Sequence, residues 1–363
     1  MATTTHPEFG ASTEALDVAK AFADQLRGKT VLITGVNRDG IGFTTAQAFA
    51  SQRPAHLIFA GRNPAKLQAC IDALREAFPD VDYRALPVDL GSQASVRAAA
   101  AVVLAWDDVP VLDLLVNNAA VMLLPERTLS VDGIELHFAT NHLGHFLLTN
   151  LLMPKLLAAA ARPGVPVGAV RVVNVSARIG GAAGLRWSDT NFETPNKDLP
   201  AAEQPRYDTH KMWGYGDTRD AAYVPIEGYF QSKVANVLFG VGLTDRLYAT
   251  HGVRGIALHP GVILTELGRN QTDATKAALQ DLLQSGAYTL RTQGAGAATT
   301  LVAALDPKLG EAGGTPPHKA ENYGAYLMDC QINDGGNPSA LSSSEATKLW
   351  AMSEKMVGET FSW

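Results

Sequence analysis

The chain has only two cysteines among 363 residues, Cys70 and Cys330, and they stand far apart. Because they lack paired spacing, they predict neither a disulfide framework nor a zinc site. The nine histidines include no His-Glu-x-x-His pattern, so no metal is expected. The usual signals of serine hydrolases and P-loop NTPases, a Gly-x-Ser-x-Gly elbow and a Gly-x-x-x-x-Gly-Lys loop, are also missing.

Clusters of positive charge and long apolar runs are lacking as well. The net charge is −6 and no basic surface is concentrated, so we expect a small-molecule partner and no nucleic acid. Residues 1–10 contain no apolar segment of the kind found in secretory signals, which predicts a cytoplasmic protein. The most apolar stretch, residues 143–161, contains His, Asn, Pro and Lys, so a buried or interface helix is expected there and no integral membrane segment.

Short apolar runs alternate with longer helical patterns in the first half of the chain. The runs occupy residues 30–34, 56–60, 83–88, 112–116 and 170–175, and helical patterns cover 41–51, 64–78 and 92–105. Because strands buried on both faces are apolar throughout and right-handed crossovers place helices on both faces, this alternation predicts a doubly wound, Rossmann-like α/β fold with a parallel sheet.

We expect a single dinucleotide-binding catalytic domain over residues 1–363. Around its core we expect an N-terminal extension (1–27), a long irregular insertion (180–227) and a C-terminal elaboration on the substrate side (266–363). Aromatic residues scattered through the insertion argue against disorder and predict an ordered flap. A surface loop is expected over 310–323, before a short strand at 325–328.

A glycine-rich segment, Thr34 to Gly42, follows the first predicted strand and opens the first predicted helix. In that context glycines allow a tight turn, and the helix N-terminus favours a pyrophosphate. This predicts a dinucleotide site formed by Gly35, Asn37, Gly40, Ile41 and Gly42.

The second predicted strand ends in Gly61-Arg62-Asn63, where an acidic residue would favour NAD. Arg62 can bind a 2′-phosphate through a forked, charge-assisted contact, and Arg38 in the glycine loop can join it. Both arginines could instead be solvated surface residues. Because Arg62 stands where an acidic residue would favour NAD, the cofactor is predicted to be NADP(H).

With these motifs the chain resembles the short-chain dehydrogenase/reductase family, also through Asn117-Asn118-Ala119-Ala120 and His259-Pro260-Gly261. Residues 141–149 and 229–236 resemble its retinol-dehydrogenase-like and fungal biosynthetic branches. The resemblance implies cofactor contacts by Asp89, Leu90, Asn117, Asn118, Ala119, Tyr229, Lys233, Val262 and Thr265. Asp89 could instead cap the following helix.

The same resemblance implies that Tyr229 is the catalytic acid or base, while Lys233 binds the nicotinamide ribose. A tyrosine with a pKa of about 10 is a poor base, and a nearby ammonium would lower that pKa. Tyr207 and Lys211 share the spacing but lie in the irregular insertion, so they are assigned to the flap. Asn141 would help to hold a water that relays protons through Lys233, or could bond its own helix backbone.

Three departures from the family pattern affect the site. The glycine loop has four residues between Gly35 and Gly40, where three are usual, and Ala120 replaces a usual glycine. Ala177 occupies the position of the usual catalytic serine, with Ser176 beside it. Ser176 could be presented by a backbone shift, or could serve only as a strand-end residue, with a flap group or Tyr229 polarising the carbonyl instead.

We therefore expect an NADP(H)-dependent oxidoreductase that interconverts a carbonyl and an alcohol on an apolar substrate, retinoid-like or from specialised metabolism. The alternative, motivated by Ala177, is an NADP(H)-binding sensor or scaffold with little redox activity. The apolar helices over 143–161 and 229–247 could form a homodimer interface, or could be core.

Overall fold

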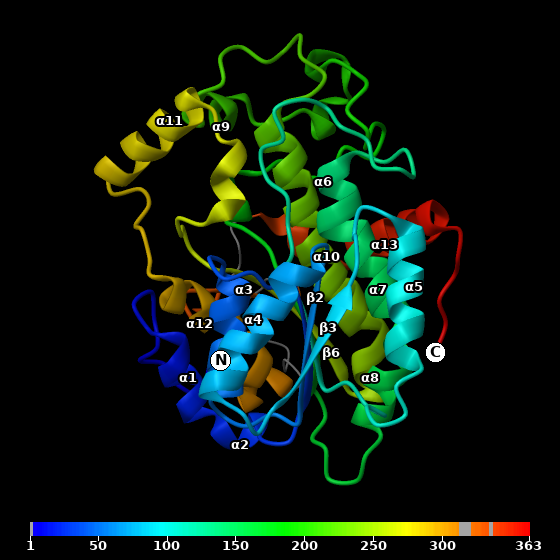
Figure 1. Cartoon of the computed structure of the whole chain (residues 1–363). Helices are drawn as coiled ribbons and strands as arrows, with labels where there is room; N and C mark the ends of the chain where they lie inside the picture. Colours follow the sequence, from blue (N-terminus) through cyan, green and yellow to red (C-terminus); the bar gives the residue numbers. More distant parts are fainter. Residues whose placement is uncertain (1–2, 312–320, 334–336) are drawn as a thin grey trace.

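In the computed structural model, which describes residues 3–311, 321–333 and 337–363, the strands form one eight-stranded sheet with order β3-β2-β1-β4-β5-β6-β7-β8 (Figure 1). All neighbours are parallel except β7 and β8. The strands are β1 (Thr30–Thr34), β2 (His56–Gly61), β3 (Asp82–Pro87), β4 (Leu114–Asn117), β5 (Val170–Val175), β6 (Val253–His259), β7 (Tyr326–Met328) and β8 (Gln331–Ile332). The doubly wound prediction is confirmed, and strand order reverses between β1 and β4.

Helices cover both faces of this sheet (Figure 1). The α-helices of the described residues are α1 (Ala15–Ala21), α2 (Ala23–Leu26), α3 (Ile41–Ala50), α4 (Pro64–Ala77), α5 (Gln93–Leu104), α6 (Leu136–Phe138), α7 (Gly144–Leu151), α8 (Met153–Ala160), α9 (Tyr207–Met212), α10 (Pro225–His251), α11 (Asp273–Gln284), α12 (Gln293–Leu305) and α13 (Ser343–Val357). Alternate residues of β5 enter opposite cores: Val172 packs on the side of α5, α7 and α10, and Val173 on the side of α3, α4 and α12.

The crossover helices begin where the sequence supplies caps. The Asn63 side chain accepts a hydrogen bond from the Lys66 N–H at the start of α4, with Pro64 in the first helical position. Ser92, and not Asp89, caps α5 in the same way. Asp89 instead accepts the Gly91 N–H at 3.0 Å. The helix boundaries predicted from these residues lie within one residue of those observed.

Two predicted boundaries are wrong. The apolar stretch 143–161 is not one helix: a π-helical turn (Ala139–Leu143) leads into α7, and the α6–α7 stretch meets α8 at a bend of 57°. Pro154 in the first turn of α8 favours a new helix start there.

The irregular segment predicted over 180–227 ends earlier than expected, because α10 begins at Pro225. Of the predicted loop over 310–323, residues 312–320 lie outside the described part of the chain.

No single helix of the described residues is long and apolar enough to cross a membrane, although the bent pair Leu136–Leu151 and Met153–Ala160 passes by length and composition. The N-terminal extension belongs to the same packed body. Its helix α1 contacts α3 and α12, and the Thr5 N–H donates to the Asp306 carboxylate at 2.7 Å.

Helix α10 is buried along most of its length, because α13 covers the side that faces away from the sheet. Every residue from Ile226 to Leu243 is buried. The Trp350 ring of α13 lies 5.0 Å from Phe146 of α7 and 5.9 Å from Phe239 of α10. Helix α10 is therefore core from Ile226 to Leu243, whereas α8 keeps Pro154 and Ala158 exposed.

We expect Trp350→Ala to lower the free energy of unfolding by about 3–5 kcal/mol, because it removes a buried aromatic from between two helices. Urea unfolding followed by circular dichroism measures this. Val131→Ala is the control: the valine is 83% exposed, so its effect should stay within about 0.5 kcal/mol. Equal, small effects of the two variants would contradict the packing role of α13.

Candidate active site

A cavity of about 1070 Å³ lies at the carboxyl ends of the parallel strands. Residues at the ends of five strands line it: Gly35 after β1, Gly61 of β2, Asn118 after β4, Ser176 after β5 and His259 of β6. This is the switch point at which doubly wound sheets bind ligands. Figure 1 shows α9 and α11 together beyond this edge of the sheet.

The glycine loop fits tightly against the loop after β4. Gly35 has φ +72°, and a Cβ there would lie 2.6 Å from the Cα of Ala119. A Cβ on Gly42 would lie 2.6 Å from Nδ2 of Asn118, which donates to the Thr34 carbonyl at 2.8 Å. Only glycine fits these two positions. The N-terminus of α3, at Gly40 and Ile41, lines the cavity and suits a pyrophosphate.

Most of the predicted cofactor residues line this one cavity, but two do not. Those that line it are Gly35, Asn37, Gly40, Ile41, Gly42, Arg62, Asp89, Leu90, Asn118, Ala119, Tyr229, Lys233, Val262 and Thr265. Arg38 is instead exposed, with its guanidinium 4.6 Å from the Phe43 ring centroid. Asn117 is buried and donates to Asn174 and Thr149, so it has no cavity surface.

Tyr229 and Lys233 occupy successive turns of α10, and both line the cavity. The Lys233 Nζ donates to the Val175 carbonyl at 2.8 Å and lies 5.6 Å from the Tyr229 ring centroid. This ties the catalytic helix to the end of β5. Tyr207 and Lys211, the pair with the same spacing, lie in α9 and do not line the cavity.

The pKa values of Tyr229 and Lys233 differ from what the sequence suggested. Burial raises the pKa of Tyr229, and burial lowers the pKa of Lys233 to about 7. Because desolvation acts on both groups, the pKa of Tyr229 is raised, and not lowered by the ammonium as the sequence suggested. Tyr229 is held in its protonated form.

Ser176 lies in the cavity wall, but its hydroxyl is engaged elsewhere. Its Oγ donates to the Lys233 carbonyl at 2.6 Å. The neighbouring Ala177 carbonyl accepts from the Tyr326 hydroxyl at 2.7 Å. The turn after β5 is thus hydrogen-bonded to α10 and β7. Ser176 makes the contacts expected of a residue that serves only at the end of the strand, which was one of the two interpretations from the sequence.

Asn141 does not line the cavity, although it lies behind it. Its Oδ1 accepts from the Val121 N–H at 2.8 Å, and its Nδ2 donates to the Val121 carbonyl and to Ser232, each at 2.9 Å. Within the π-helical turn, the side chain therefore binds the loop after β4 and helix α10, and not the backbone of its own helix.

Much of the remaining cavity wall is apolar and comes mainly from residues that sequence reasoning did not single out. They are Met122, Trp213, Ile226, Phe230, Ile263, Leu264, Leu267, Leu279 and Tyr288. Trp213 follows α9 and Leu279 belongs to α11, so segment 180–227 and the C-terminal elaboration both reach the site. The amphipathic pattern of α11 is the signal that could have identified Leu279.

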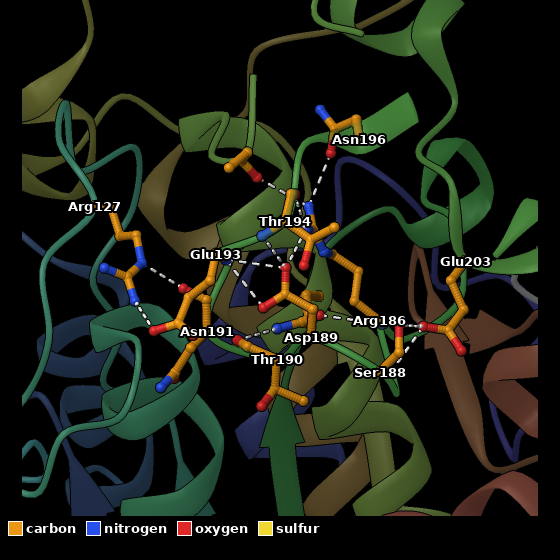
Figure 2. A network of polar contacts seen from close by, with 12 residues as sticks. Arg127, Arg186, Ser188, Asp189, Thr190, Asn191, Glu193, Thr194, Asn196 and Glu203 are labelled. Atoms are coloured by element: carbon orange, nitrogen blue, oxygen red, sulfur yellow. Dashed lines mark hydrogen bonds and ion pairs between the residues drawn. The ribbon is translucent and has the colours of Figure 1, made fainter. Parts of the chain in front are cut away.

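Segment 180–227 is held together by a buried polar network around Arg186 (Figure 2). Its guanidinium donates to Asp189, Asn196 and the Thr194 carbonyl at 2.5, 2.8 and 2.9 Å. Burial by itself would raise the pKa of Asp189, but the N–H groups of Glu193 and Thr194, together with Arg186, hold it below its usual value. A buried carboxylate thus keeps its charge at neutral pH.

Segment 180–227 also makes polar contacts with helix α10 at residues before and after Tyr229. The Gln231 side chain accepts from the Arg186 N–H at 3.2 Å and donates to the Thr190 carbonyl at 3.1 Å. One turn earlier, Glu227 lies 3.0 Å from Nε2 of His210. The segment therefore helps to fix the catalytic helix as well as to line the cavity.

Among the described residues, no group of three or more His, Cys, Asp or Glu side chains is arranged to hold a metal ion.

Comparisons with known proteins find a family pattern, curated relatives and solved structures that are similar to this chain. The pattern described as short chain dehydrogenase matches residues 29–188. Oxidoreductase fscI of Fusarium equiseti is 34% identical over 253 residues, covering 70% of this chain and 94% of that protein. Retinol dehydrogenase 13 of Mus musculus is 33% identical, over 91% and 84%. A crystal structure of an uncharacterized protein from Mycobacterium paratuberculosis superposes with a TM-score of 0.58 and 28% identity, over 94% and 98%.

We expect Arg186→Met to lower the free energy of unfolding by about 3–5 kcal/mol, because it leaves the buried Asp189 carboxylate without its cation. Urea unfolding measures the loss, and limited proteolysis should cut within residues 188–196. Arg219→Met is the control in the same segment: its ion pair with Asp217 is exposed, so the change should stay within about 1 kcal/mol. Similar values for both variants would contradict the central role of Arg186.

Proposed function

The chain belongs to the short-chain dehydrogenase family, and from that premise we propose that it is an NADP(H)-dependent oxidoreductase that interconverts a carbonyl and an alcohol on an apolar substrate. The observation that carries the proposal is the meeting of Tyr229 and Lys233 with the glycine loop in one cavity, most of whose remaining wall is apolar. This arrangement suits a hydride acceptor that is held beside a proton donor.

The preference for NADP(H) rests on charge at the end of β2. Arg62 lines the cavity there, and Lys66 lies in the first turn of the following helix. The Lys66 Nζ is 3.5 Å from the exposed Glu266 carboxylate, a pair that a 2′-phosphate can replace. The β2 end itself supplies no carboxylate of the kind that favours NAD.

In the proposed reduction, Tyr229 supplies the proton. Because burial raises its pKa, the hydroxyl is protonated near neutral pH and can donate to the substrate oxygen. NADPH, when bound, supplies the hydride to the carbonyl carbon. The carbon gains a hydride and the oxygen a proton, which converts a ketone or aldehyde to the alcohol.

Tyr229 polarises the carbonyl without help from the usual serine in this proposal, because Ala177 replaces it and Ser176 donates to a backbone carbonyl. One missing donor costs about 3–4 kcal/mol of transition-state stabilisation. A reactive carbonyl tolerates that cost best. Together with the apolar wall and the relative named as a retinol dehydrogenase, this supports an apolar, retinoid-like or specialised-metabolite substrate.

We further propose that the protein is located in the cytoplasm.

Loss of NADPH absorbance on a panel of apolar ketones and aldehydes tests the activity. We expect turnover by the wild type, and a loss of about 100-fold or more in kcat for Tyr229→Phe with unchanged NADPH affinity, because only the proton donor is removed. Tyr207→Phe, in the pair of equal spacing outside the cavity, should keep full activity.

Unchanged turnover in Tyr229→Phe would contradict the acid-base role. Tight NADPH binding with no turnover on any member of the panel would favour the alternative, a sensor or scaffold, whereas absence of binding would overturn the cofactor site.

Cofactor choice is tested by Arg62→Leu. We expect kcat/KM with NADPH to fall about 10- to 100-fold, the equivalent of one charged hydrogen bond, while kcat/KM with NADH stays unchanged. Arg75→Leu is the control, since Arg75 is exposed near the far end of α4 and does not line the cavity. Equal losses with both cofactors would refute recognition of the 2′-phosphate by Arg62.

A further inference from the structure

His145 of α7 connects the cofactor side of the site to its catalytic side. Its Nε2 lies 2.8 Å from the hydroxyl of Thr34, the last residue of β1. Its Nδ1 lies 2.9 Å from the Asn141 carbonyl, in the π-helical turn. His145 and both of these partners are buried, so the imidazole spans the distance between the two elements without solvent.

The direction of each hydrogen bond in this bridge follows from its neighbours. The Thr34 hydroxyl oxygen accepts two N–H groups, those of Asn118 and Ala119, each at 2.9 Å. Both lone pairs are thereby used, so the hydroxyl proton must be donated to Nε2 of His145. The imidazole proton then lies on Nδ1, which donates to the Asn141 carbonyl.

A neutral imidazole is what this bridge requires. Burial lowers the pKa of His145 to about 4, an effect that the Asn141 carbonyl opposes and the Lys233 ammonium reinforces. Protonation of Nε2 would remove the acceptor of the Thr34 hydroxyl. The bridge is therefore intact over the neutral pH range.

The polar chain continues from Asn141 to the catalytic helix. Asn141 donates to the Ser232 hydroxyl at 2.9 Å, and Ser232 donates to the Tyr229 carbonyl at 2.7 Å. Hydrogen bonds, joined through the covalent structure of Asn141, thus link the loop after β4, which lines the cofactor end of the cavity, to the backbone of the proposed proton donor.

We propose that His145 is a positioning residue, which holds the Asn118-Ala119 loop and the Tyr229 helix in register through Thr34 and Asn141. The inference rests on the proposed function, and it adds a residue that touches neither the cavity nor the reacting atoms. It assigns each imidazole nitrogen a separate effect: Nε2 supports cofactor binding, and Nδ1 supports the rate of the chemical step.

Two half-replacements separate these effects. His145→Gln places an amide oxygen near Nε2 and keeps an acceptor for Thr34, whereas His145→Asn places an amide N–H near Nδ1 and keeps a donor for Asn141. We expect His145→Gln to retain the Kd for NADPH and lose about tenfold in kcat. His145→Asn should retain kcat at saturating NADPH and weaken its Kd about tenfold, as one buried hydrogen bond allows. His145→Phe should lose both.

His142→Phe is the matched control. His142 belongs to the same helical stretch and is equally buried, but its Nε2 lies 2.8 Å from Ser353 of α13, away from the cavity. We expect this variant to lower Tm without changing Kd or kcat. If His145→Phe likewise changes only Tm, or if the two half-replacements behave alike, the positioning role is refuted.

Amide hydrogen exchange at Asn118 and Ala119 tests the bridge without substrate or cofactor. Faster exchange in His145→Asn and His145→Phe than in His145→Gln and His142→Phe supports the bridge even if the wild type reduces nothing on the panel. Equal exchange in all four variants would refute the bridge while leaving NADPH turnover by the wild type, and so the proposed function, intact.

Discussion

Helix α10 passes through the interior of the molecule, and the site depends on its being enclosed. The sheet covers one side, α6, the π-helical turn (Ala139–Leu143) and α13 cover others, and segment 180–227 binds its first turns through Glu227 and Gln231. Since every residue from Ile226 to Leu243 is buried, the helix cannot rotate or slide without breaking contacts on several sides. Tyr229 and Lys233 are thereby fixed relative to the ends of β1, β4 and β5.

The same enclosure sets the charges of the site. Burial keeps the proton on Tyr229 and brings the Lys233 pKa to about 7, while His145, behind the cavity, stays neutral. The positive groups proposed to bind cofactor, Arg62 and Lys66, lie instead at the exposed end of the cavity. The proposed site thus places the cofactor phosphate against exposed cations and the reacting carbonyl against the buried Tyr229.

The sequence was a good guide to the sheet and a partial guide to the side chains. Apolar runs such as 30–34 and 170–175 predict strands because their burial on both faces does not depend on any particular partner. Asn117 and Arg38 could not be placed in this way. Asn117 turns toward Asn174, 57 residues further along the chain, and Arg38 stacks on Phe43 in a loop one residue longer than usual. The bend before α8 and the cover provided by α13 likewise arise from tertiary packing, which local pattern does not encode.

Transfer of deuterium from NADPH labelled at nicotinamide C4 to an apolar ketone is the most direct test of the account. With each C4 position labelled in turn, we predict that one of the two reagents gives an alcohol with a single deuterium on the carbinol carbon, as determined by mass spectrometry, and that Tyr229→Phe binds the labelled cofactor but forms no labelled product at a comparable rate. Bound cofactor with no deuterium in the alcohol from either reagent, or equal labelling by Tyr229→Phe, would contradict hydride transfer assisted by the Tyr229 proton.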